Sequence, residues 1–233
     1  MIFKRKKRDQ QQEVAEQNAP PAVEEQPSQL AGNGPKDIND IENPDDYLNF
    51  GSLLLKPISG MKVRLDMEEK TKRVISLSLE VAESRIQLQA FARSKSEQLW
   101  PGISNKIAED LTKQQGELYI RDGEFGKELL AKVPQQLPDG RSGHVALRFI
   151  GVDGPRWFLR IVVGGAAISN EEASEVVDEL VRGVVVDRGT SPLPPQELLP
   201  LSVPKNARTH AEPPPGAPAV QRPERGPEIT QIG

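Results

Sequence analysis

The chain contains no cysteine and only two histidines among its 233 residues. The lack of cysteine excludes disulfide bonds, thiol nucleophiles and cysteine-ligated zinc or iron–sulfur centres. Nucleophilic catalysis needs a base beside the nucleophile, but His144 begins an expected strand and His210 lies near the end of the chain. Asp122, Glu124 and Asp153 fall in expected turns, where acidic residues usually bond to nearby backbone. We therefore predict no catalytic residue, no metal site and no cofactor.

Aromatic residues are also scarce, at 4% of the chain, and they are unevenly placed. Nine of the ten lie between Tyr47 and Phe158, whereas six prolines lie in the C-terminal tail. The two ends therefore have too little apolar material to offset the entropy lost on folding. This composition predicts a disordered tail, basic and then rich in Gln, Glu and Pro, a single α+β core that ends in a Pro-rich arm, and a disordered Pro-rich tail, over residues 1–45, 46–204 (arm 192–204) and 205–233.

No apolar run approaches the roughly 18–20 residues that a membrane span needs, so we expect a cytoplasmic protein without such a span. The basic cluster near the N-terminus resembles the start of a signal peptide, but the polar stretch Asp9–Glu13 follows it, which argues against export. The cluster is either a solubilising terminus or a weak, salt-sensitive contact for nucleic acid or anionic lipid. It consists of Lys4, Arg5, Lys6, Lys7 and Arg8.

Apolar and polar residues alternate with period two after Gly51. Met61, Val63 and Leu65, for example, alternate with charged residues. Such alternation predicts half-buried strands, and short polar links between them predict antiparallel neighbours. The predicted strands are Met61–Met67, Ile75–Val81, Ile86–Ala90, Glu117–Arg121, Glu128–Val133, His144–Ile150 and Arg156–Val163, with a short buried segment at Val184–Val186.

Two segments have helical spacing instead. One begins near Gln98, because Pro101 is tolerated only in a first turn, and it ends before Gly116. The other opens at Ser169, with Glu172 completing a capping box. The order of elements predicts an α+β fold: a mostly antiparallel sheet of hairpins with two helices on one of its faces, flanked by disordered tails.

Arginines on the last two long strands form the candidate binding site. If these strands pair as a hairpin, Arg148, Arg156 and Arg160 can lie on one surface around Phe158. Guanidinium groups beside an aromatic ring suit phosphate, carboxylate or nucleic-acid bases. The alternatives are a solvated strand face, or arginines paired with acidic residues of the two helices. Trp157 falls on the apolar face and is expected in the core.

The stretch Gly-Val-Asp-Gly-Pro-Arg-Trp-Phe-Leu-Arg at 151–160 and six shorter segments have a specific pattern. Together they resemble the actinobacterial domain of unknown function 3710 family over about Pro35 to Pro204. The stretch Gly151–Arg160 is the longest and most specific of them, and Pro101 is one departure. The resemblance implies a bacterial cytoplasmic protein without an established activity, whose genes lie near nucleotide-metabolism and nucleic-acid-binding genes. The segments are 51–53, 60–65, 87–92, 99–100, 125–129, 151–160 and 185–189, and the structural signature residues are Phe91, Trp100, Gly126, Asp153, Gly154, Pro155 and Trp157.

The sequence therefore favours a non-catalytic binding or adaptor module with an unknown protein partner, or with nucleic acid as the partner. One alternative is a sensor or enzyme for a small anionic metabolite that uses the arginine-lined sheet face. Another is a structural protein that assembles through its sheet edges. The sequence does not define the oligomeric state.

Overall fold

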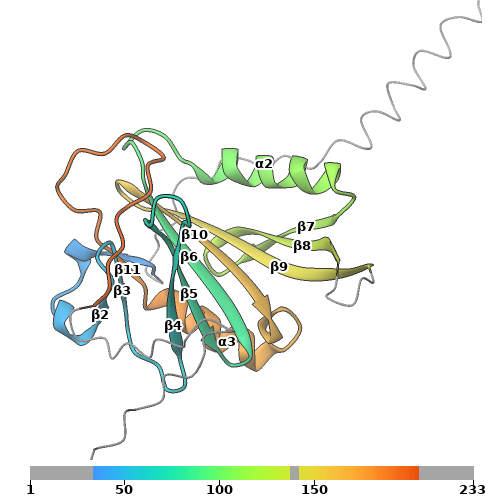
Figure 1. Cartoon of the computed structure of the whole chain (residues 1–233), viewed down its shortest axis with the longest axis horizontal. Coiled ribbons are helices and arrows are strands. Elements are labelled where there is room, and N and C mark those ends of the chain that lie inside the picture. The colour runs from blue at the N-terminus through green and yellow to red at the C-terminus, as the bar shows by residue number, and fades with distance from the viewer. Residues whose placement is uncertain (1–33, 137–141, 205–233) are drawn as a thin grey trace, which may run out of the picture.

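A seven-stranded antiparallel sheet organises the part of the chain that the computed structural model describes, residues 34–136 and 142–204 (Figure 1). Successive strands are joined mostly by short hairpin turns, as the short polar links predict. The strand order across the sheet is β4-β5-β6-β10-β9-β8-β7. The strands are β4 (Lys62–Met67), β5 (Val74–Val81), β6 (Ser84–Ala92), β7 (Glu117–Gly123), β8 (Gly126–Gln136), β9 (Ser142–Asp153) and β10 (Trp157–Gly165).

One face of this sheet carries the larger core. Alternate residues such as Leu77, Leu88 and Ile161 point to it and are fully buried. A small four-stranded sheet and helix α3 (Glu171–Arg182) pack on this face. The small sheet has the order β1-β11-β3-β2, with β1 (Lys36–Asp37), β2 (Leu48–Asn49), β3 (Leu53–Leu55) and β11 (Val185–Val186).

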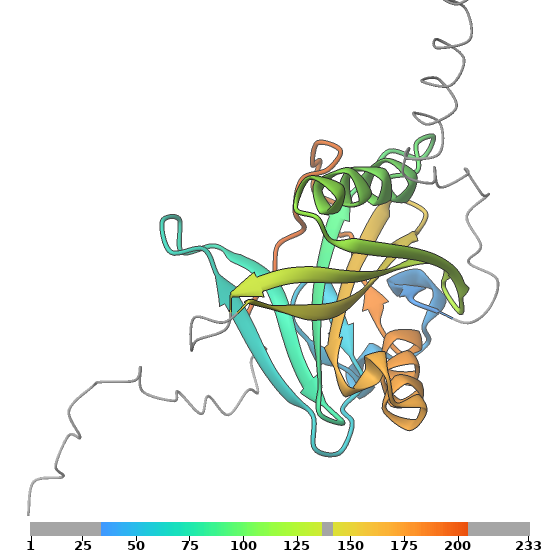
Figure 2. The same cartoon turned by 90° about the vertical axis from the view of Figure 1, so that its right-hand side faces the viewer.

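Helix α2 (Trp100–Lys113) packs on the opposite face, over β7, β8 and β9. Its core partners include Phe149 and Phe158, the alternate residues of β9 and β10 that point away from α3. The expectation that both helices cover one face is therefore wrong, and Figure 2 shows the two helices well apart. The physical reason is that β9 and β10 carry apolar residues on both faces. Each face of the sheet must therefore pack against another element to exclude water.

The helix starts differ slightly from the predicted ones. Helix α2 begins two residues after Gln98, with Pro101 in its first turn as expected. Helix α3 does not open at Ser169, because the side chain of Asn170 caps it and accepts a hydrogen bond from the backbone N–H of Ala173 at 3.0 Å. Among the described residues no helix is both long and apolar enough to cross a membrane. The 3₁₀ turns are η1 (Ile38–Asp40), η2 (Pro44–Asp46) and η3 (Ala166–Ile168).

The folded part begins earlier than the predicted boundary at residue 46. Strand β1 pairs in parallel with β11, and Lys36 donates its backbone N–H to the carbonyl of Val184 at 2.9 Å. The carboxylate of Asp37 accepts a 2.8 Å hydrogen bond from the indole Nε1 of Trp157, a side chain that is fully buried. Residues 34–45 therefore belong to the core, while residues 1–33, which include the Lys4–Arg8 cluster, and residues 205–233 lie outside the described part.

The C-terminal arm lies along the core, as its leucines predict. Leu199 is buried, and its backbone N–H donates to the carbonyl of Ala90 at 2.8 Å. Leu198 forms an isolated bridge with Phe91 at the end of β6, and Leu201 forms one with Gly51. The arm therefore packs against the core and adds backbone contacts to β6.

Truncation tests the corrected boundary. A chain that starts at Gly34 is expected to keep the melting temperature of the full chain. A chain that starts at Asp46 loses β1 and leaves the buried indole N–H of Trp157 without its acceptor, which costs about 1–3 kcal/mol. The single change Asp37→Ala should reproduce much of this loss in thermal denaturation. Equal melting temperatures for the two truncated chains would contradict the assignment of residues 34–45 to the core.

Candidate functional site

The signature stretch around Asp153 forms a structural corner where β9 turns into β10. The carboxylate of Asp153 accepts hydrogen bonds from the backbone N–H groups of Leu99 and Trp100, at 2.9 and 3.1 Å. It therefore holds the start of α2, where free backbone N–H groups attract a negative charge. The buried guanidinium of Arg93 lies 3.9 Å from the same carboxylate and also donates to the carbonyl of Gly154. No motif in the sequence pointed to this role of Arg93.

Two glycines of this corner make room for the two indole rings. A Cβ atom at Gly151 would overlap the ring of Trp100, and one at Gly154 would overlap the ring of Trp157. Trp100 is nearly buried, and its Nε1 donates to the carbonyl of Lys127 at 2.7 Å. The predicted core position of Trp157 is confirmed.

The other signature residues have structural positions as well. Pro155 is exposed in the turn before β10, and Gly126 begins β8 with a φ of 105°. The ring of Phe91 lies 6.2 Å from that of Phe158 and is partly exposed. The signature residues thus hold the corner and the surrounding packing together.

Arg148 does not belong to a binding surface with Arg160. The register pairs Arg148 with Val163 and Arg160 with Gly151, so the two arginines leave opposite faces of the sheet. Arg148 is 1% exposed and forms a two-pronged ion pair with the fully buried Glu128, at 2.7 and 2.8 Å. Its third contact is Asp178 of α3, at 2.7 Å. The alternative of pairing with acidic residues of the helices therefore applies to this arginine only through Asp178, because its main partner, Glu128, lies on strand β8.

Burial and the ion pairs act oppositely on this cluster. Burial disfavours the charged guanidinium of Arg148, but the hydrogen bonds and charges of Glu128 and Asp178 outweigh it and raise its pKa. Burial raises the pKa of Asp178, even though Arg148 opposes that change. The cluster ties α3 to β8 and β9 and is not accessible to a ligand.

Removal of Arg148 tests this structural role. Arg148→Gln leaves the buried carboxylate of Glu128 with only the half-exposed Arg121 as counter-charge, which costs about 3 kcal/mol. The melting temperature should fall by roughly 10 °C. Arg156→Gln is the matched control, because Arg156 is exposed and its replacement should cost under about 0.5 kcal/mol. Equal melting temperatures for the two variants would contradict the structural role of Arg148.

The remaining two arginines are also separated. Arg156 was expected to be the first residue of the strand. It lies instead in the turn before β10 and is exposed. Arg160 lies within β10 on the same face as Phe158, which is fully buried under α2. The expected single surface of three arginines around an accessible Phe158 is therefore wrong. Arg160 alone keeps a position suited to ligand contact.

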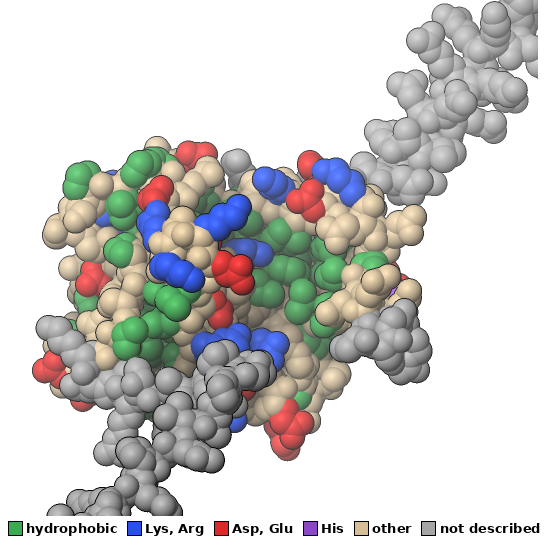
Figure 3. Space-filling view, in the orientation of Figure 1, with side chains coloured by type: hydrophobic (Ala, Val, Ile, Leu, Met, Phe, Trp, Pro, Cys, Tyr) green, Lys and Arg blue, Asp and Glu red, His purple; other side chains and the backbone are tan. Residues whose placement is uncertain are grey.

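The face of the sheet that carries Arg160 has two different halves. Over β7, β8 and β9 it is apolar and covered by α2. Over β4, β5, β6 and the middle of β10 it carries polar side chains, and we call this half the open face. Figure 3 shows charged and polar side chains beside a hollow lined with hydrophobic ones below α2. The open face consists of Lys62, Arg64, Asp66, Ser76, Ser78, Glu80, Arg85, Gln87, Gln89 and Arg160.

Polar groups of the open face bond to one another across strands. Asp66 accepts hydrogen bonds from the hydroxyls of Ser76 and Ser78, at 2.8 and 2.5 Å. Gln87 donates to the hydroxyl of Ser76 at 3.2 Å, and Arg64 pairs with Asp66 at 3.1 Å. Burial alone would raise the pKa of Asp66, but the two serine hydroxyls and Arg64 outweigh it and lower that pKa below its ordinary value.

Asp66 should therefore contribute to stability in a pH-dependent way. Because its folded pKa is lowered, its contribution is complete above the unfolded value and is lost as the pH falls through the folded pKa. Asp66→Asn should cost about 1 kcal/mol at pH 7. It should also make the loss of stability below about pH 4 shallower, as measured by denaturant unfolding across pH. Glu80→Gln, on the same face, is the control, and a steeper acid limb in Asp66→Asn would contradict the network.

Arg160 lies at the border between the two halves of the face. Its Nη1 donates to the side-chain carbonyl of Gln89 at 3.0 Å, and Gln89 is in turn held by the carbonyl of Ile75 at 3.1 Å. The Nε of Arg160 is buried and has no hydrogen-bond partner among the described residues. Burial lowers the pKa of Arg160, and no acidic side chain of the described part counteracts it.

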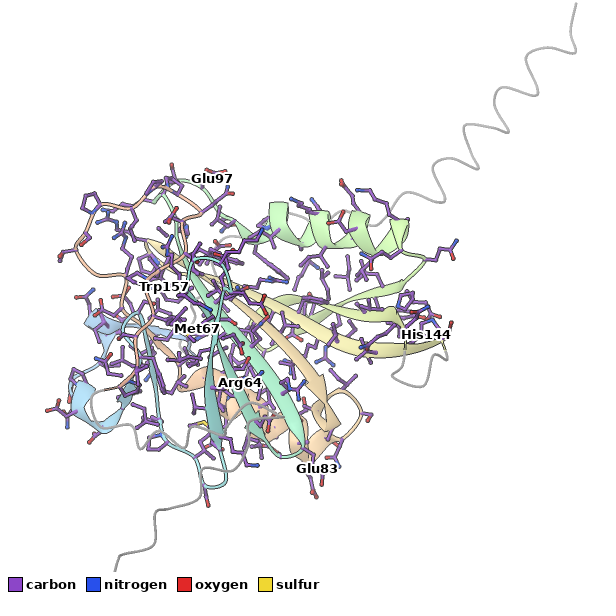
Figure 4. All side chains as sticks on the ribbon, in the orientation of Figure 1. Arg64, Met67, Glu83, Glu97, His144 and Trp157 are labelled. Atoms are coloured by element: carbon purple, nitrogen blue, oxygen red, sulfur yellow. The ribbon has the colours of Figure 1, made fainter. Side chains whose placement is uncertain are left out.

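The candidate acidic residues and His144 do not form a common site in the described ranges. No group of three or more potential metal ligands is placed there to hold an ion. His144 lies exposed near the start of β9, and Figure 4 shows it far from Arg64 and Trp157. Asp153 is engaged with helix α2, and Glu124 is ion-paired with Arg182.

The described residues thus define an α+β protein whose antiparallel sheet separates two helices and leaves one polar half-face open. The chain belongs to the family "Protein of unknown function (DUF3710)", whose model matches residues 34–210 and so covers more than half of the sequence. No curated protein matches the chain.

One similar solved structure is the solution structure of cyanobacterial PsbP (CyanoP) from Synechocystis sp. PCC 6803. It shares 7% identity at a TM-score of 0.35, with 58% of this chain and 86% of that chain covered. A similarity of this size supports no conclusion about fold or function.

Proposed function

We propose that the protein is a non-catalytic binding or adaptor module whose open face receives a protein partner. The observation that carries this proposal is the network on the open face. Helix α2 packs over the other half of the face and does not cover this network. Ser76 is nevertheless fully buried and Asp66 is largely buried. A network that fixes polar side chains in advance reduces the entropy lost when a partner binds.

The charge of the open face favours a protein over nucleic acid. Arg64 pairs with Asp66, and Arg85 pairs with Glu80. Among the described residues this leaves Lys62 on β4 and Arg160 on β10 as the cations of this face without an ion pair, and β5 and β6 separate them. Nucleic acid would instead need several free cations along one surface. A nucleic-acid contact remains a prediction for the Lys4–Arg8 cluster, which lies outside the described residues.

The proposal includes a cytoplasmic location and an actinobacterial origin. A cytoplasmic location is supported by the lack of cysteine in the sequence, and the actinobacterial origin is carried by the family resemblance. Fractionation of the native cell should find the protein with cytosolic markers. Recovery with the envelope would contradict the predicted location.

Two matched double variants test the role of the open face. Arg64→Gln with Arg85→Gln removes two exposed charges from it, while Lys106→Gln with Lys113→Gln removes two exposed charges from α2. Both should keep the melting temperature within a few degrees, because exposed ion pairs contribute about 0–1 kcal/mol.

A protein captured by the full chain from native lysate, with nuclease present, should then be purified and titrated with each variant by calorimetry. The open-face variant should bind it at least about tenfold more weakly, whereas the α2 variant should bind like the wild type. Equal affinity for both variants would contradict the open face as the docking surface. Capture that depends on intact nucleic acid would contradict the protein partner.

A further inference from the structure

The guanidinium of Arg160 is a half-buried cation that lacks a counter-ion in the described part of the chain. Its single side-chain hydrogen bond goes to the neutral Gln89, and its buried Nε donates to no acceptor. By contrast, the more deeply buried Arg148 is paired with Glu128. A desolvated charge without a partner is costly in a folded protein, and an incoming anion would relieve that cost.

The surroundings of Arg160 are apolar and aromatic. Phe158 and Val162 precede and follow it on the same face of β10, and both belong to the cluster under α2. Gly151 lies opposite Arg160 on the neighbouring strand β9. The indole of Trp100 occupies the space that a side chain at Gly151 would fill. The rings of Trp100 and Phe158 are stacked, with centroids 6.4 Å apart. The cation thus borders a largely apolar surface.

Part of this apolar surface is accessible. Leu147 and Val162 on the strands and Ile103 and Ile107 on α2 are only partly buried, although they pack against the same core cluster. Figure 3 shows hydrophobic side chains lining a hollow below α2, next to charged groups. A ligand anchored at Arg160 could therefore place an apolar body along these side chains.

We propose that Arg160 anchors a small-molecule site for an amphipathic carboxylic acid. The carboxylate accepts hydrogen bonds from the Arg160 guanidinium, and Gln89 holds that guanidinium in place. The apolar body of the ligand lies against Val162, Leu147 and the underside of α2. A single uncompensated arginine matches a monoanion better than a phosphate dianion, which is usually held by several donors or cations.

This site is separate from the proposed protein-docking role. The small ligand needs Arg160 and the apolar surface, whereas the docking test changes Arg64 and Arg85. The two ideas can therefore fail independently. The Arg64→Gln/Arg85→Gln variant should bind the acid like the wild type.

Titration of the purified full chain with decanoate, below its micelle concentration, tests the site. The fluorescence of Trp100 and the side-chain amide resonance of Gln89 should report saturable binding, with a dissociation constant on the order of 0.1 mM. Affinity should rise from octanoate to dodecanoate. Decan-1-ol, which is neutral, and inorganic phosphate, which has no apolar body, should each bind at least tenfold more weakly.

Arg160→Gln should weaken decanoate binding at least tenfold, because a charged hydrogen-bond donor is lost. Arg156→Gln is the matched control and should bind decanoate like the wild type. The comparison of decanoate with decan-1-ol uses the wild-type chain, so it remains decisive even if Arg160→Gln fails to fold. The proposal is overturned by absence of saturation up to millimolar decanoate, by equal binding of decan-1-ol, or by a loss smaller than tenfold in folded Arg160→Gln.

Discussion

The carboxylate of Asp153 is the contact on which the arrangement of both cores depends. It holds the first backbone N–H groups of α2 at the end of β9, and so it places the helix over one face of the sheet. A few residues on, Trp157 enters the core of the other face and bonds to Asp37 of the N-terminal strand. The turn between β9 and β10 therefore links the two faces, and Gly151 and Gly154 allow the two indole rings to lie against it. The part of the resemblance from Gly151 to Trp157 is thus explained by architecture.

The three arginines show how similar residues acquire different roles. Arg148 is held in the buried pair with Glu128, and its removal would leave that carboxylate with only the half-exposed Arg121 as counter-charge. Arg156 is exposed in a turn, where its replacement should cost little stability. Arg160 alone combines partial burial with the lack of an acidic partner in the described residues. Partial burial makes its charge costly enough to favour a ligand, yet leaves it reachable. The two proposals for this protein divide the same face of the sheet, with the protein partner on the polar half and the acid at its border with α2.

Local pattern was sufficient to predict most of the elements. Period-two alternation predicted the strands between Met61 and Ala90, because each strand of an antiparallel sheet buries one face. The turn residues located the later strands, although β8 and β9 extend further at both ends than expected. The helix starts were less certain, because Ser169 and Asn170 are both good caps and only the backbone geometry selects Asn170. The two-residue turn between β5 and β6 has φ values of 46° and 54°, a conformation that usually carries glycine or asparagine. Ala82 and Glu83 occupy it instead, so the sequence carries no glycine signal for this turn.

By itself, the sequence determined the α+β class, the cysteine-free chemistry, the buried position of Trp157 and the family resemblance. These follow from composition, periodicity and short motifs, which are local properties of the chain. The tertiary structure decided which face each helix covers, that Asp37 belongs to the core, and that Arg148 and Arg160 point to opposite sides. Register causes this difference: a shift of one residue between β9 and β10 exchanges the faces of every side chain. That shift is invisible in either strand alone, and it appears only when the two strands are paired.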